Sequence, residues 1–206
     1  MIKVRLEPRA EKSQWFAYLS PVLAALLTLT VGMILFAALG KPPLKVLHTF
    51  FVSPISDLYG LGELAVKATP ILLCATGLAL CYRANVWNIG AEGQLLMGGL
   101  MGSWAALQFL ETQAFWVLPV VLIAGVMGGM AWAAIPAVLK TQFNTNVILT
   151  TIMLNYIALN LLLFAVHGPL KDPNGFNFPE SALFPDWILL PILFDGSRVH
   201  LSLIHI

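Results

Sequence analysis

Long apolar segments alternate with short polar ones along most of the chain. A helix that crosses the hydrocarbon core of a bilayer needs about 20 consecutive apolar residues. Five segments approach or exceed that length, and they lie at residues 16–39, 64–82, 95–109, 115–139 and 147–166. A further apolar stretch, residues 187–194, indicates the start of another span. The pattern predicts an all-α, polytopic membrane helix bundle with about five complete spans and the start of a sixth.

Prolines divide the chain into its parts. The Pro42–Pro43 pair ends the first span, because proline lacks a donor and clashes with the preceding turn of a helix. Residues 44–63 are of mixed polarity and predict a short interfacial helix and a loop. We therefore expect a cytoplasmic segment at residues 1–15 and a transmembrane domain at residues 16–206 that is incomplete at its C-terminus.

The composition supports a membrane protein. Hydrophobic residues make up 59% of the chain and charged residues only 10%, and the mean hydropathy is +0.84. Ordinary globular domains carry about a quarter charged residues. The net charge of +1 offers no basic field for nucleic acid, so membrane lipid is the partner that this composition favours.

The basic residues predict an orientation. Lys3, Arg5, Arg9 and Lys12 all precede the first span, which places the N-terminus in the cytoplasm by the positive-inside rule. With five spans, the polar segment at residues 167–186 lies outside.

Small residues at fourfold spacing predict where helices pack. In lipid, helices associate through close backbone approach, which small residues permit. Gly98 and Gly102 form one such pair in the third span, and Gly125 and Gly129 form another in the fourth. We expect these four glycines to pack helices against one another.

Glu92 is the polar residue that most needs an explanation. An ionisable side chain at membrane depth is costly and usually faces a cavity or a partner. On a helix Asn88 would share its face, and Gln94 follows closely. Glycines around these residues permit a broken helix, a feature that transporters use at substrate sites. We expect Asn88, Glu92 and Gln94 to line a substrate pathway; alternatively, Glu92 lies at the cytoplasmic interface beside Arg83 and caps the third helix.

A second polar set lies on the fifth span. Thr151 and Asn155 share one helical face, while Tyr156 and Asn160 share the next. Thr151 and Asn155 are the second part of the expected substrate pathway. The alternative is hydrogen bonding between helices without contact to a ligand.

Signatures of enzymes are absent from the sequence. It has no H-E-x-x-H, no G-x-S-x-G and no phosphate-binding P-loop, and its four histidines are scattered. Cys74 and Cys81 lie seven residues apart, too far along a helix for a disulfide, and fit small apolar helix positions. We expect no catalytic residue, no metal site and no cofactor in this chain.

Two motifs carry a resemblance to a known family. Residues 84–99, ANVWNIGAEGQLLMGG, and residues 146–158, NVILTTIMLNYIA, resemble ABC-transporter permeases of the nucleoside and simple-sugar uptake group, within the branched-chain amino acid and ribose-type permease superfamily. Residues 67–73 are similar to the entry of that family's second helix.

The resemblance implies a permease subunit in the bacterial plasma (inner) membrane. It implies cytoplasmic ATPase subunits that use ATP, a second permease subunit, and an extracytoplasmic solute-binding protein or lipoprotein. It also implies further spans and a cytoplasmic coupling segment beyond this chain. The Asn-Ile-Gly-Ala-Glu-Gly-Gln variant is similar to nucleoside permeases; a simple sugar or another small polar solute is the alternative. From the residues alone, a secondary transporter or channel with Glu92 as an ion site also stays open.

Overall fold

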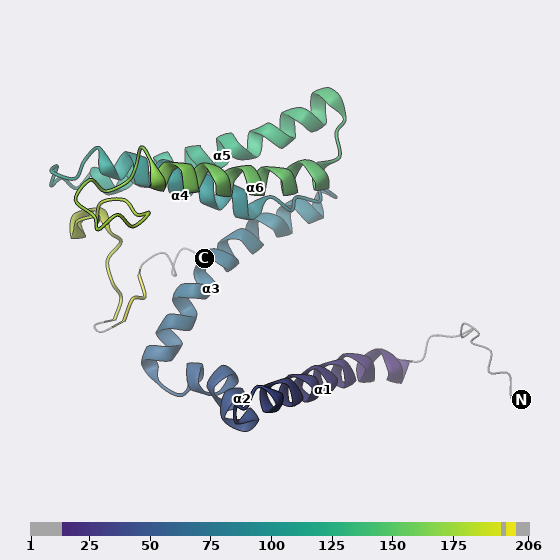
Figure 1. The fold of residues 1–206 in the computed structure, drawn as a ribbon. Coiled ribbons are helices and arrows are strands. Elements are labelled where there is room, and N and C mark those ends of the chain that lie inside the picture. Colours follow the sequence, from purple (N-terminus) through teal and green to yellow (C-terminus); the bar gives the residue numbers. More distant parts are fainter. Residues whose placement is uncertain (1–13, 195–196, 201–206) are drawn as a thin grey trace, which may run out of the picture. The chain divides into compact units, whose positions relative to one another are not determined.

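The computed structural model describes residues 14–194 and 197–200, and the chain divides into two compact units, Met1–Leu61 and Gly62–Ile206 (Figure 1). Two short 3-10 helices, η1 (Ser53–Ile55) and η2 (Asp186–Ile188), accompany the α-helices. The α-helices of the described residues are α1 (Gln14–Ala38), α2 (Pro43–Phe51), α3 (Leu58–Arg83), α4 (Ala91–Leu107), α5 (Val117–Phe143) and α6 (Val147–His167).

Four of the described helices, α1, α3, α5 and α6, are long and apolar enough to cross a bilayer. The remaining expected span, the third at residues 95–109, corresponds to α4, which has 17 residues. All five apolar segments are therefore helical, and the all-α membrane fold is confirmed. Residues 187–194, expected to start a sixth span, contain part of η2 and then an isolated antiparallel bridge between Ile192 and His200, not a long helix. Pro191 interrupts this stretch, and a proline cannot donate the hydrogen bond that a helix interior requires.

In the first unit, a left-handed glycine ends α1. Gly40 has a φ of 69°, and its N–H bonds to the carbonyl of Ala37 at 3.0 Å. The N–H of Lys41 bonds to the carbonyl of Phe36 at 2.9 Å, which completes a Schellman motif. Pro43 then occupies the first position of α2, where its missing donor costs nothing. The expected short helix at residues 44–63 is α2.

In the second unit, α4 packs against both α5 and α6, and the three helices run side by side (Figure 1). The turn between α5 and α6 is short because Asn144 adopts a left-handed φ of 51°. Asn146 then caps α6, since its Oδ1 accepts the N–H groups of Ile148 at 3.0 Å and Leu149 at 3.3 Å. This turn makes α5 and α6 antiparallel neighbours.

The opposite end of this helix group is closed by an apolar cluster. Ala106, Val117 and Ile188 are buried there, and Phe109 and Phe184 pack against them. The segment that follows α6 therefore lies at the same end as the connection between α4 and α5. The expected topology requires that arrangement; which side of the membrane this end faces stays a prediction.

Candidate solute pathway

The polar motif of the sequence lies where α3 ends and α4 begins. Asn85, at a left-handed φ of 55°, ends α3 in a second Schellman motif, in which the N–H of Val86 bonds to the carbonyl of Cys81 at 2.9 Å. Residues 86–90 have no helical structure, and α4 starts at Ala91. The chain is thus broken between two helices at the position where the sequence predicts a discontinuity.

Side chains of α6 hold this broken segment. The N–H of Ile89 donates to Thr151 Oγ1 at 3.1 Å. Asn155 Oδ1 accepts the N–H of Gly93 at 2.8 Å, and Asn155 Nδ2 donates to the carbonyl of Ile89 at 2.9 Å. Within the segment, Asn88 Oδ1 accepts the N–H of Gly90 at 2.8 Å. Four backbone groups at the break, the N–H groups of Ile89, Gly90 and Gly93 and the carbonyl of Ile89, therefore find side-chain partners.

The glycines of the motif allow α6 to come this close. A Cβ on Gly90 would lie 2.9 Å from Thr151 Cβ. A Cβ on Gly93 would lie 2.8 Å from Asn155 Oδ1 and 3.1 Å from Asn155 Cα. Any larger residue at either position would push α6 away and lengthen the hydrogen bonds to Thr151 and Asn155.

Asn88 and Gln94 face each other across the start of α4. Asn88 Nδ2 lies 3.5 Å from Gln94 Oε1, at the limit of a hydrogen bond. Both side chains line a cavity of about 290 Å³ between α3 and the first turns of α4. Cys74 and Cys81 line the same cavity from α3. The cavity thus joins two carboxamides and two thiols on otherwise apolar walls.

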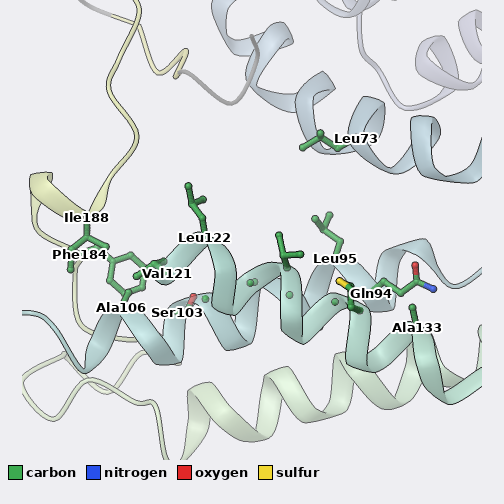
Figure 2. Close-up of a pocket in the computed structure, with 17 residues that line it drawn as sticks. Leu73, Gln94, Leu95, Ser103, Ala106, Val121, Leu122, Ala133, Phe184 and Ile188 are labelled. Carbon is green, nitrogen blue, oxygen red and sulfur yellow. The ribbon is translucent and has the colours of Figure 1, made fainter. Parts of the chain in front are cut away.

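A larger groove runs along α4 and α5 and also begins at Gln94. It encloses about 660 Å³. Figure 2 shows the carboxamide of Gln94 toward one end of the groove, near Ala133, and Phe184 and Ile188 at the other end. Between these ends the groove is apolar apart from Ser103 and the backbone of its glycines. Gln94 therefore lines both the groove and the cavity.

The four glycines expected at a helix interface lie where α4 meets α5. A Cβ on Gly98 would lie 2.9 Å from the carbonyl oxygen of Gly125, and a Cβ on Gly129 would lie 3.2 Å from that of Gln94. Gly102 is roomier, since its nearest neighbour would be Val121 O at 3.5 Å. The same glycines line the groove, so α4 and α5 meet through their backbones there.

The sequence analysis missed Gly128. This glycine is buried, and a Cβ on it would lie 2.6 Å from both Cβ and Cγ of Met101. Gly128 lies three residues after Gly125, so it is not part of the fourfold spacing that relates Gly125 to Gly129. The feature of the sequence that could have indicated Gly128 is that it directly precedes Gly129. Cys74 and Cys81 were likewise interpreted only as apolar helix residues, although both line the cavity.

The structure separates Glu92 from the other polar residues of its motif. Glu92 lies exposed in the first turn of α4, where the helix dipole favours a carboxylate. The expected shared helical face with Asn88 is wrong, because Asn88 precedes α4 in the irregular segment. Glu92 lines neither the groove nor the cavity that holds Asn88 and Gln94. A role for Glu92 in transport stays a prediction.

On α6 the two expected faces differ in their surroundings. Thr151 is buried, with 1% of its surface exposed, and Asn155 is half-buried; both bond to the segment before α4. Tyr156 and Asn160 are exposed, and Asn160 Nδ2 bonds only within its helix, to the carbonyl of Tyr156 at 2.7 Å. The geometry of Thr151 and Asn155 is that of bonding between elements, and their contact with a solute stays a prediction.

Comparisons with known proteins agree with the resemblance seen in the motifs. The family described as branched-chain amino acid transport system / permease component matches residues 60–197. The glucose ABC transporter permease protein TsgB13 of Haloferax volcanii is 37% identical over 93% of this chain and 50% of its own length. The guanosine ABC transporter permease protein NupP of Bacillus subtilis is 32% identical over 90% of this chain and 53% of its own length.

A third relative has a similar identity over a shorter region. The nucleoside ABC transporter permease protein NupB of Lactococcus lactis is 32% identical over 73% of this chain and 41% of its own length. No solved structure matches the chain. The chain spans about half the length of the curated relatives it matches, as their covered shares of 50% and 53% indicate. With a family match over most of its length and several apolar helices, this multi-pass membrane protein belongs to the permease components of the branched-chain amino acid transport family, which includes ABC transporter permeases.

Proposed function

We propose that the chain is part of the permease subunit of an ATP-driven importer for a small, polar, uncharged solute, and that this solute is a nucleoside. The observation that carries the proposal is the pair of carboxamides of Asn88 and Gln94, which lie 3.5 Å apart. Both line the cavity, and Gln94 also lines the groove. Asn88 lies in the irregular segment between α3 and α4, and Gln94 lies at the start of α4. Membrane transporters often place their substrate at such a break between two helices.

The residues that line the groove and the cavity support an uncharged solute. Of the described residues that line the groove or the cavity with Asn88 and Gln94, none is Lys, Arg, Asp or Glu. A phosphorylated solute requires cationic groups or converging backbone donors. Carboxamides instead offer both donors and an acceptor, which suit base edges and hydroxyl groups.

A simple sugar is the second candidate. The relative with 37% identity is a glucose permease, whereas two relatives with 32% identity are permeases for guanosine and for nucleosides. A nucleoside presents a flat base with an edge of alternating donors and acceptors, which one carboxamide can pair at two points. The apolar walls beside Gln94 suit the faces of such a base better than a ring of hydroxyl groups.

Partner subunits complete the proposed importer. Cytoplasmic ATPase subunits supply the energy from ATP, a second permease subunit pairs with this one, and an extracytoplasmic binding protein or lipoprotein delivers the solute. The complex lies in the cell membrane. These partners rest on the family and on the relatives, and the remaining half of the permease contributes contacts to them.

The test is uptake by the full-length protein with its partner ATPase in cells that lack other carriers. We expect labelled guanosine to enter when ATP is kept and an uncoupler dissipates the proton gradient. Dependence on the gradient at constant ATP would instead indicate a secondary transporter. Uptake of glucose but not guanosine would support the sugar, and uptake of a nucleotide would contradict both.

A matched pair of variants on α4 links uptake to the site. Gln94→Leu removes a carboxamide from the groove, and Gln108→Leu removes one at the other end of the helix, where Gln108 Nε2 donates only to the carbonyl of Trp104 at 3.3 Å. We expect Gln94→Leu to raise the KM for guanosine about tenfold or more and Gln108→Leu to leave it nearly unchanged. Equal effects of the two substitutions would remove Gln94 from the pathway.

A further inference from the structure

Asn155 takes the place of one backbone hydrogen bond of α4. In a continuous helix the N–H of Gly93 would bond to the carbonyl of Ile89, four residues earlier. Here the Asn155 carboxamide lies between these two groups: its Oδ1 accepts from Gly93 N–H at 2.8 Å and its Nδ2 donates to Ile89 C=O at 2.9 Å. Since both groups are already paired, α4 does not gain the Gly93–Ile89 bond, the first that an extension of the helix would form.

Thr151 completes the pairing of Ile89. Its Oγ1 accepts the Ile89 N–H at 3.1 Å while the hydroxyl donates to the carbonyl of Val147, in its own helix, at 2.8 Å. Both backbone groups of Ile89 are therefore held by α6. Thr151 is buried, so water does not compete for these bonds.

The two α6 residues act next to the proposed site but do not line it. The cavity contains Asn88 and Gln94 but neither Thr151 nor Asn155. The backbone groups that Asn155 binds belong to the immediate neighbours of those two residues, Ile89 and Gly93. The direction of each carboxamide therefore depends on a bond made by Asn155.

We propose that Asn155, supported by Thr151, is a positioning residue: it holds the chain between α3 and α4 in its broken form and so fixes the distance between Asn88 and Gln94. Without its carboxamide, Gly93 N–H and Ile89 C=O can bond to each other, and α4 extends by up to a turn toward Asn88. This changes the shape of the cavity. The expected effect on solute binding rests on the proposed function, whereas the effect of Asn155 on the chain between α3 and α4 does not.

The first experiment compares Asn155→Leu with Asn160→Leu in the full-length transporter with its partners. Both variants remove a carboxamide from α6, but Asn160 bonds only within its helix. We expect Asn155→Leu to raise the KM for labelled guanosine about tenfold at near-normal membrane abundance, and Asn160→Leu to change it less than about twofold. A fall in Vmax at unchanged KM, or equal effects of both substitutions, would overturn the proposal.

A second readout does not depend on transport. Cys74 and Cys81 line the cavity, so the rate at which N-ethylmaleimide alkylates them in membranes reports its shape. We expect the alkylation rate to change about threefold or more in Asn155→Leu and to stay unchanged in Asn160→Leu, because the modification of a thiol depends on its accessibility. Equal alkylation rates in both variants and the wild type would overturn the proposal.

Two further measurements keep the outcomes distinct. If Asn155→Leu fails to accumulate, a comparison of Thr151→Val with Thr150→Val tests the same proposal, because Thr150 Oγ1 donates to the carbonyl of Asn146, the N-cap of its own helix, at 2.7 Å. Equal alkylation rates in these two variants would count against a positioning role. In the wild type, guanosine should slow the alkylation of Cys74. Absence of this protection, with the variant effects intact, would refute the proposed nucleoside site but leave the positioning role of Asn155 supported.

Discussion

Gly128→Ala should loosen the contact between α4 and α5 more than any change of similar size nearby. The added Cβ would lie 2.6 Å from Met101 Cβ and 2.9 Å from the carbonyl oxygen of Met97. Neither atom can rotate away, because one is a backbone atom and the other is bonded to a backbone atom. Carbon atoms prefer about 3.5–4.0 Å, so the two helices must separate locally by about 1 Å.

The size of the effect follows from this separation. A gap of about 0.5–1 Å forfeits a quarter to a half of the dispersion energy between the atoms concerned, and in lipid such packing is much of what joins helices. Overpacking of this kind typically costs about 1–3 kcal/mol. Replacing glycine by alanine within a helix gains about 1 kcal/mol in propensity, which offsets part of the cost.

Gly99→Ala is the matched control, because it adds a methyl group to α4 at a position where the new Cβ would meet no atom within 4 Å apart from the adjacent backbone of its own helix. The propensity gain is common to both variants, so the difference in their unfolding free energies isolates the contact, about 1–3 kcal/mol. Thermal denaturation of the full-length protein in detergent measures both midpoints. Gly99→Ala should melt at or above the wild type and Gly128→Ala below it. Equal midpoints would refute the close packing of α4 against α5 at this position.

Two other predictions concern the charge and the orientation. Glu92→Gln keeps the shape of the side chain but removes the charge; if Glu92 serves transport, abundance stays near normal while uptake falls, and normal uptake would favour its interpretation as a helix-terminal residue. Cysteines introduced at Asn174 and at Thr141 should label oppositely with an impermeant thiol reagent on cells whose native cysteines are replaced by serine, with labelling at Asn174 only. Labelling at Thr141 alone would reverse the topology.

The helices were predictable because hydropathy is a property of whole segments. The predicted fifth span at residues 147–166 differs from α6, Val147–His167, by one residue, and the first span differs from α1 by two residues at its start and one at its end. The third span was placed four residues late, at residue 95, because hydropathy follows apolar side chains whereas α4 begins at Ala91. The start of α4 is set by Gly90 and by the side chain of Asn155 on α6.

The partners of the polar motif could not be predicted from its own residues. Asn155 lies 62 residues beyond Gly93, and only folding brings the two together. The sequence did indicate that Thr151 and Asn155 share a face, since they are one helical turn apart. It left open whether that face meets a solute or another helix. In the structure both side chains bond to the backbone of Ile89 or Gly93, and their contact with a solute stays a prediction.

The glycines that pack α4 against α5 also line the groove. Gly98 and Gly125 permit the backbones of α4 and α5 to meet, and both also line the groove, to which they add no side chain. A substitution at Gly98 therefore changes helix association and fills the groove together, so loss of uptake alone could not assign a role to it. Gly99 lines the groove, and a Cβ added there would meet no atom within 4 Å apart from the adjacent backbone of α4, so Gly99→Ala narrows the groove without straining the interface. If the groove carries solute, bulkier residues at Gly99 should reduce uptake in order of their volume without lowering the thermal stability below that of the wild type. If uptake is instead insensitive to volume at Gly99, the solute does not pass along this face of α4.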